Sequence, residues 1–122
     1  MIIGIFKVMA ATGMLPGTVA ANIVNVIDLE SMSTNCSTVA AYPAKLYGSF
    51  GDLGFDSSPI VCGGYSTTYS NRCYAMKNGN WTPEFNLTEA KRYSATVTIP
   101  GNYPIRILAI GQTSWILSYG EQ

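Results

Sequence analysis

The sequence predicts an all-β chain, and three observations support this prediction. Its apolar runs are short and end at glycines, as Ile60-Val61-Cys62 does before Gly63-Gly64, and such runs are typical of buried strands. Segments spaced by about 50 residues align with one another. Charged residues make up only 11% of the chain, against about 25% in an average globular protein, which indicates sheets that bury both faces. No segment carries a convincing helical pattern.

The internal repeat has three copies. Residues 44–49 align with residues 90–95, which stand 46 positions later, and residues 60–64 align with residues 108–112, which stand 48 positions later. Upstream, Ala11-Thr12-Gly13 stands 51 positions before Cys62-Gly63-Gly64. Such a period indicates an array of equivalent units, each of which needs its neighbours to bury a core.

In the first copy, we expect residues 2–10 to form the second strand of a unit, residues 13–21 its loop and residues 23–29 its third strand. An alternative is a secretory leader, because this start is apolar and contains Val19-Ala20-Ala21, which suits cleavage. Lys7 lies inside the apolar stretch rather than before it, which favours the strand interpretation.

The middle copy predicts four strands. Residues 46–55 are rich in glycine and aromatic residues, which suits an inner strand, and Asp56-Ser57-Ser58-Pro59 predicts the turn that follows. Residues 60–62 are the second strand. Residues 72–77 alternate in character and form the third, and Asn78-Gly79 is a strong hairpin signal before the fourth.

The last copy is incomplete. Residues 105–110 predict a second strand, whereas residues 113–122 depart from the expected loop and third strand. We therefore expect a frame change or an exon boundary in that segment.

The middle copy resembles a kelch repeat. Kelch repeats carry a double glycine at the end of an apolar strand, then a Tyr, then a Trp, and Gly63-Gly64, Tyr74 and Trp81 fit this pattern. The other copies are degenerate, with Thr12-Gly13 and Gly111-Gln112 at the double glycine. The resemblance implies a kelch-type β-propeller made of four-stranded antiparallel blades, incomplete as given.

The resemblance divides the chain into an incomplete first blade at residues 1–38, a complete blade at residues 39–86 and an incomplete third blade at residues 87–122. Propellers typically close with four to eight blades. We therefore interpret the chain as a fragment, a truncated gene model or a splice product, and expect further blades in the same chain or by assembly.

Three cysteines bear on the compartment. Cys62 and Cys73 lie on neighbouring predicted strands and come within disulfide range if they stand opposite each other, although two buried thiols are an equal alternative. Cys36 then has no partner within the chain. Asn86 and Asn35 stand in glycosylation acceptor patterns. Together these features favour the extracellular space or the secretory pathway, with the cytoplasm as the alternative.

Composition excludes several functions. The chain has no His, so it offers neither a His-based catalytic triad nor an imidazole ligand for zinc or copper. Seven basic and seven acidic residues give zero formal net charge without a basic run, which argues against nucleic-acid binding. No apolar stretch approaches the roughly 20 residues of a membrane span. We expect neither catalysis nor a cofactor.

The function that remains is binding. The resemblance implies that loops between strands and between blades form the contact face, here residues 65–71 and 88–92. Tyr, Ser and Asn suit such surfaces, and Arg92 is placed to pair with an acidic group on a protein or glycan partner. The alternatives are a fragment of a galactose-oxidase-like kelch enzyme and a small secreted disulfide protein with a cleaved leader. The candidate binding residues are Tyr65, Thr67, Tyr69, Asn71, Glu89, Lys91 and Arg92.

Overall fold

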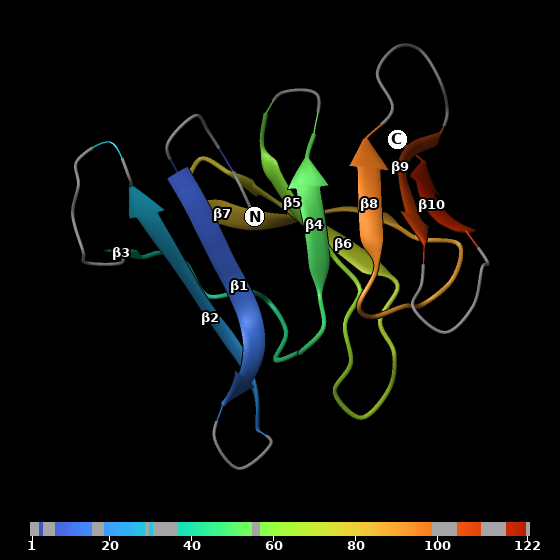
Figure 1. The fold of residues 1–122 in the computed structure, drawn as a ribbon, viewed down its shortest axis with the longest axis horizontal. Coiled ribbons are helices and arrows are strands. Elements are labelled where there is room, and N and C mark those ends of the chain that lie inside the picture. The colour runs from blue at the N-terminus through green and yellow to red at the C-terminus, as the bar shows by residue number, and fades with distance from the viewer. Residues whose placement is uncertain are drawn as a thin grey trace.

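The fold is all-β, as the sequence predicts. A computed structural model describes residues 3, 7–15, 19–28, 30, 37–54, 57–98, 105–110 and 117–121. Within these residues the chain forms ten strands and no helix, and the strands make three antiparallel sheets (Figure 1).

The sheets follow one another along the chain. The first sheet has the order β1-β2-β3, with β1 at Lys7–Leu15, β2 at Val19–Asp28 and β3 at Ser37–Thr38. The middle sheet has the order β4-β5-β6-β7, with β4 at Phe50–Leu53, β5 at Pro59–Cys62, β6 at Arg72–Lys77 and β7 at Asn80–Asn86. The third sheet has the order β8-β9-β10, with β8 at Ala95–Thr98, β9 at Ile105–Ile110 and β10 at Leu117–Glu121.

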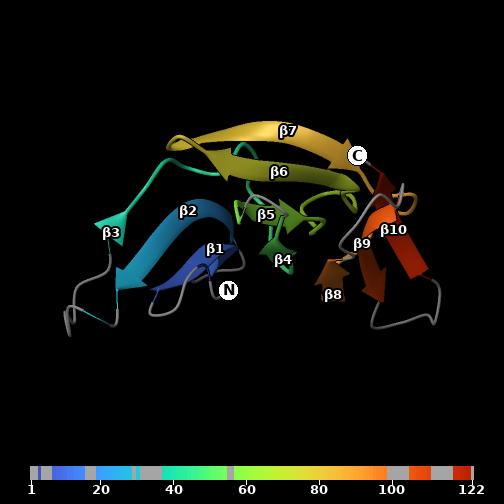
Figure 2. The ribbon, with the colours of Figure 1, turned by 90° about the horizontal axis from the view of Figure 1, so that it is seen from above.

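The three sheets fan out from one side of the molecule. β1, β4 and β8 lie at the centre of the fan, and in Figure 2 the first sheet extends to the left, the middle sheet to the top and the third sheet to the right. Side-chain hydroxyls join β8 to β4, because Thr96 Oγ1 donates to the Gly51 carbonyl at 3.0 Å and Thr98 Oγ1 to the Leu53 carbonyl at 2.8 Å.

The same strand pairing recurs in all three sheets. Each sheet has an antiparallel pair at the equivalent position of the repeat, and these pairs are Ala11 with Val24, Cys62 with Cys73, and Ile110 with Leu117. Ala11, Cys62 and Ile110 are separated by the offsets of 51 and 48 that the sequence alignment predicts. The repeat in the sequence is therefore also a repeat in hydrogen-bond register.

The connections between sheets repeat as well. Leu46 N donates to Ala21 O at 3.1 Å before the middle sheet, and Lys91 N donates to Ser70 O at 3.2 Å before the third. Lys91 consequently occupies the position that Leu46 occupies one repeat earlier, and both side chains are buried.

The inner strands correct one part of the sequence alignment. Phe50 stands opposite Cys62 and Ala95 stands opposite Ile110, so β8 follows β4 by 45 positions. Gly48 and Tyr93 keep this offset, with positive φ angles of 72° and 51°. The predicted offset of 46 is wrong by one position, because the alignment matched Tyr47 with Tyr93, whereas the register places Arg92 at the position of Tyr47.

Four predicted segments differ from the observed strands. Residues 2–10 and 13–21 are expected to be a strand and a loop, but β1 and β2 pair along almost their whole length through an irregularity between Ala11 and Gly13. The inner strand predicted at residues 46–55 is only β4, since Leu46 and Tyr47 form isolated bridges instead. Residues 113–122 contain β10, which takes the third-strand position, and Leu117 and Tyr119 alternating with small residues account for it.

The middle sheet carries a core on each face. Val61 points toward the first sheet and shares a cluster with Met9, Val24, Tyr42 and Leu46. The flanking residues of β5 point the other way, because successive strand residues face opposite sides of a sheet. The cluster on that second face consists of Phe50, Ile60, Cys62, Cys73, Ala75 and Leu87.

Tyr42 is the centre of the core between the first and middle sheets. Its hydroxyl donates to Val61 O at 3.0 Å, and its ring meets the Tyr74 and Trp81 rings edge-on at 5.4 and 5.0 Å. Trp81 Nε1 donates to Ala40 O at 2.9 Å. Burial raises the pKa of the Tyr42 hydroxyl well above its ordinary value, and Tyr74 raises it further. The Tyr and Trp of the repeat motif thus hold two sheets together.

The disulfide between Cys62 and Cys73 is confirmed, with an S–S distance of 2.03 Å. Replacing the pair by Cys62→Ala and Cys73→Val reproduces the Ala11 and Val24 pair of the first sheet while removing the cross-link. We expect the free energy of unfolding to fall by about 3 kcal/mol, since the unfolded chain loses a loop constraint. Denaturant titration with and without reductant measures this; a variant as stable as the oxidised parent would contradict it.

Thr12 occupies the position in the first copy of the repeat that Gly63 occupies in the middle copy. Both residues have positive φ angles, of 61° and 66°. A β-branched residue is strained in this region of backbone space. We expect Thr12→Gly to raise the free energy of unfolding by about 1 kcal/mol. Thr12→Ala is the control, because it keeps a Cβ and therefore most of the strain; equal effects of the two variants in thermal unfolding would rule out the backbone explanation.

Candidate functional site

Arg92 is surrounded by four tyrosine rings. Its Cζ atom lies 4.9 Å from the ring centroid of Tyr65, 5.2 Å from that of Tyr93, 5.4 Å from that of Tyr69 and 5.6 Å from that of Tyr47. Each distance is within the range of a cation–π contact. We call these five residues the tyrosine–arginine cluster.

The rings of the cluster also contact one another. Tyr65 meets Tyr47 and Tyr69 in edge-on arrangements, with centroids 5.4 and 5.1 Å apart. Arg92 Nη1 donates a hydrogen bond to the hydroxyl of Tyr47 at 3.1 Å. Because cation–π contacts contribute about 0.5–2 kcal/mol each, these contacts fix the position of the guanidinium.

Three separate segments build the cluster. Tyr47 precedes β4, Tyr65 and Tyr69 lie in the loop between β5 and β6, and Arg92 and Tyr93 lie between β7 and β8. All three segments lie at the lower end of the molecule in Figure 1. Paired backbone hydrogen bonds of 3.0 and 2.9 Å join Tyr47 to Tyr65, and Tyr93 N donates to the Gly48 carbonyl at 2.7 Å, so the backbone itself holds the segments together.

The double glycine positions the loop between β5 and β6. Gly63 and Gly64 have positive φ angles of 66° and 108°, and Gly64 N donates to Lys91 O at 2.8 Å. A Cβ on Gly63 would meet the Lys91 carbonyl oxygen and lie 2.5 Å from the Phe50 ring. Only glycine combines this backbone conformation with such close approach.

The cluster is accessible and positively charged. Tyr69 and Tyr93 are 51% and 50% exposed, and Arg92 is half-buried between them and the other two rings. The ion pairs that the structure describes join Lys77 to Glu84 and Lys91 to Glu89, and do not include Arg92. Five N–H donors belong to a guanidinium. The arrangement therefore presents a cation with spare donors between aromatic faces, which suits a carboxylate ligand.

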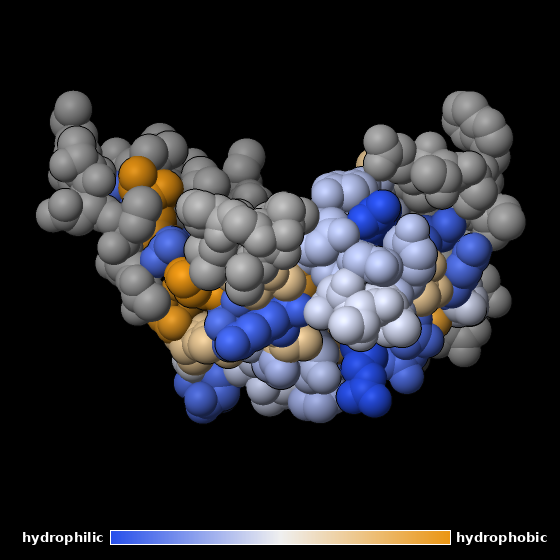
Figure 3. Space-filling view, turned by 90° about the horizontal axis from the view of Figure 1, so that it is seen from below, coloured by the Kyte–Doolittle hydropathy of each residue, from blue (hydrophilic) through white to orange (hydrophobic). Residues whose placement is uncertain are grey.

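The surface seen from this end is weakly polar over the middle of the molecule, where Figure 3 is pale. Tyrosine, serine and threonine give such intermediate hydropathy, and these residues dominate the loop at residues 65–71. The apolar surface in the same view gathers on the side of the first sheet.

The structure brings together three of the predicted binding residues, Tyr65, Tyr69 and Arg92. Others have different surroundings: Asn71 Nδ2 donates to Leu87 O at 3.2 Å, and Lys91 is buried with its Nζ 3.5 Å from Glu89 Oε2. Thr67 is exposed in the loop.

Sequence reasoning missed Tyr47 and Tyr93. Both stand in the aligned segments at residues 44–49 and 90–95, so the signal was present as a repeated aromatic position. Their convergence on Arg92 depends on contacts across 45 positions, and a repeat pattern alone does not give these contacts.

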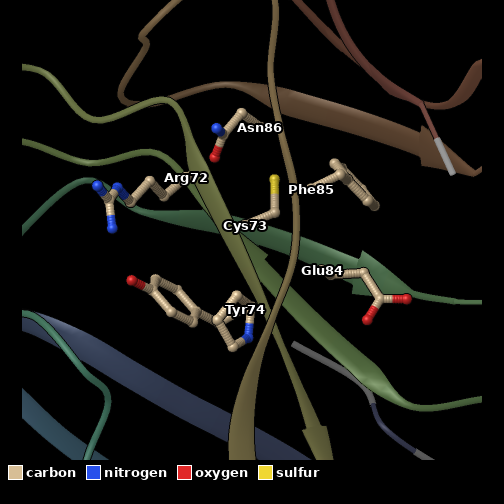
Figure 4. Close-up of a pocket in the computed structure, with 7 residues that line it drawn as sticks. Arg72, Cys73, Tyr74, Glu84, Phe85 and Asn86 are labelled. Atoms are coloured by element: carbon tan, nitrogen blue, oxygen red, sulfur yellow. The ribbon is translucent and has the colours of Figure 1, made fainter.

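A pocket lies between β6 and β7. It has a volume of about 330 Å³ beside the disulfide and is lined by Arg72, Cys73, Tyr74, Pro83, Glu84, Phe85 and Asn86. Figure 4 shows the charged groups of Arg72 and Glu84 pointing away from each other, so they do not converge on one ligand. Asn86 is exposed at the end of β7, as a glycan acceptor must be, whereas Asn35 lies outside the described residues.

Other kinds of site are not found in the described part of the chain. No three metal-ligating side chains among the described residues lie close enough to hold an ion. The search of those same residues also finds no helix long and apolar enough to span a membrane. No protein-family model matches this chain, and no curated protein matches it either.

The role of Gly63 is testable against Gly79, which has a similar positive φ of 79° but open space where a Cβ would stand. We expect Gly63→Ala to lower the free energy of unfolding by about 3 kcal/mol or more, since strain and overlap add. Gly79→Ala should cost only about 1 kcal/mol from backbone strain. Equal losses in denaturant titrations would show that close packing at Gly63 is unimportant.

Proposed function

We propose that this chain is part of a kelch-type β-propeller and serves as a non-catalytic interaction module that binds an acidic protein or glycan partner through the tyrosine–arginine cluster. In this proposal the blades are residues 1–38, 39–86 and 87–122, and each contributes one of the three sheets.

The propeller proposal is supported by the repetition of the sheets. Their strands share one pairing register, with Cys62 opposite Cys73 where the other sheets have Ala11 opposite Val24 and Ile110 opposite Leu117. The sheets also fan out around β1, β4 and β8 as blades do around an axis (Figure 2).

One observation carries the binding proposal, namely the half-buried Arg92 guanidinium enclosed by four tyrosines on a loop face. A carboxylate accepts two parallel hydrogen bonds from such a group, and burial among rings strengthens the attraction. The half-exposed rings of Tyr69 and Tyr93 add apolar contact area for the rest of the partner. Rigid tyrosines lose little conformational entropy on binding.

An extracellular or secretory location belongs to the same proposal. The disulfide fits an oxidising compartment, where such bonds persist. The exposed Asn86 fits a glycosylated protein of that compartment.

The test of binding uses two carboxylate-bearing probes, a poly-glutamate peptide and a sialylated oligosaccharide. We expect one of them to perturb the tyrosine fluorescence and the Arg92 Nε–H resonance. Arg92→Gln should weaken that binding at least about tenfold, as loss of a charge-assisted hydrogen bond implies.

Arg72→Gln is the matched control, because Arg72 is exposed at the start of β6 and stands outside the cluster. Its affinity should equal that of the parent. Binding that Arg92→Gln leaves unchanged, or the absence of binding to both probes, would count against the proposed function.

A further inference from the structure

One face of the first sheet packs against the middle sheet, and we call the other, which no sheet among the described residues covers, the uncovered face. Met9 and Val24 point into the core shared with the middle sheet. Ile23, Asn25 and Ile27 alternate with the inward residues of β2 and therefore point to the opposite side. Ile23 is 45% exposed, and no sheet of the described residues lies against this side. In Figure 3 the apolar surface gathers over the first sheet.

The equivalent face of the middle sheet is covered. Since Val24 corresponds to Cys73 in the pairing register, Asn25 corresponds to Tyr74. Tyr74 packs against the cluster that contains Met9 and Val24 of the first sheet. In the middle sheet, this face packs against the sheet that precedes it in the chain. The uncovered face of the first sheet is therefore equivalent to a face that packs against a preceding sheet.

The third sheet also has a face that no sheet of the described residues covers, and it is the face opposite to the one that packs on the middle sheet. Thr96 and Thr98 of β8 point toward β4, so Ala95 and Val97 point away from it. Val97 is 60% exposed. Ala95 corresponds to Phe50, which is buried in the core on the far face of the middle sheet. In the middle sheet, the equivalent face packs against the sheet that follows it in the chain.

The uncovered face of the first sheet and the uncovered face of the third sheet are therefore equivalent to the two faces that pack on each other between successive sheets of the chain. Docking the third sheet of one copy onto the first sheet of another would continue the contact that already joins successive sheets within the chain. Such a head-to-tail contact is heterologous, and it forms a ring when its rotation closes.

We propose that two copies of this chain assemble head to tail into a closed ring of six sheets. The described residues supply three sheets, and propellers typically close with four to eight, so two copies give the number that fits this range. The fan leaves one side open in Figure 2, where the second copy would lie. This inference rests on the proposed propeller architecture and does not depend on the ligand.

Light scattering coupled to size-exclusion chromatography of the 122-residue protein tests it. The expected mass is twice 13.1 kDa at high protein concentration. A parent protein that stays at 13.1 kDa, or that forms open-ended larger species, would overturn the inference.

Two variants test the direction of the contact. Ile23→Glu and Val97→Glu place a charge on one face each, and each variant alone should be monomeric while keeping the circular dichroism of the parent. An equimolar mixture should form dimers again, because one contact between unchanged faces remains. Lys45→Glu, at an exposed residue of the connection between β3 and β4 and on neither strand that forms these faces, should leave the dimer intact. Dimers in both single variants, or no dimers in the mixture, would overturn the head-to-tail arrangement.

Probe binding measured on the same samples separates the two proposals. A dimer that binds neither acidic probe contradicts the proposed function alone. A monomer that binds a probe through Arg92 contradicts the proposed assembly alone.

Discussion

The structure depends on the packing of one sheet against the next. A sheet with apolar residues on both faces needs a neighbour on each face to bury them from water. Here Val61 and its neighbour Ile60 are both buried, on opposite sides of β5. Tyr42 fills the space between the first and middle sheets from the segment that connects them. The connection between the first and middle sheets therefore helps to set how these two sheets lie, because it places Tyr42 between them.

The candidate site is a by-product of the same packing. Because each connection returns to the same end of the fan, Tyr47 and Arg92 arrive beside the loop that the double glycine turns back on itself. Leu46 and Lys91 occupy equivalent buried positions in the two connections, and the residue after each, Tyr47 or Arg92, lies in the cluster. The repeat that packs the sheets thereby also gathers side chains at a shared surface.

Much of the fold could be predicted from the sequence. The apolar run before Gly63-Gly64, the alternation in residues 72–77 and the Asn78-Gly79 turn are local signals, and β5, β6 and the hairpin to β7 follow them. The cysteine pair was open between a bridge and two thiols because opposition depends on register, which the spacing alone does not give. The predicted offsets of 51 and 48 between the second strands agree with the observed strand register, because these strands carry the strongest apolar pattern.

The remainder could not be predicted because it depends on contacts between distant segments. The extension of β1 past Ala10 depends on Thr12 adopting a glycine-like backbone, which its residue type disfavours. Burial of Lys91 follows from its place in the repeat and not from its chemistry. Tyr47 and Tyr93 are recognisable as site residues only once Arg92 is placed between them.

The measurement that tests the central claim most directly is a double-mutant cycle between Val24 of β2 and Val61 of β5, which belong to one buried cluster between the two sheets. Val24→Ala and Val61→Ala, singly and together, are compared by denaturant unfolding. If the sheets share a core, the two losses of stability are coupled by about 1 kcal/mol. Losses that add to within about 0.3 kcal/mol would mean that the sheets do not pack on each other.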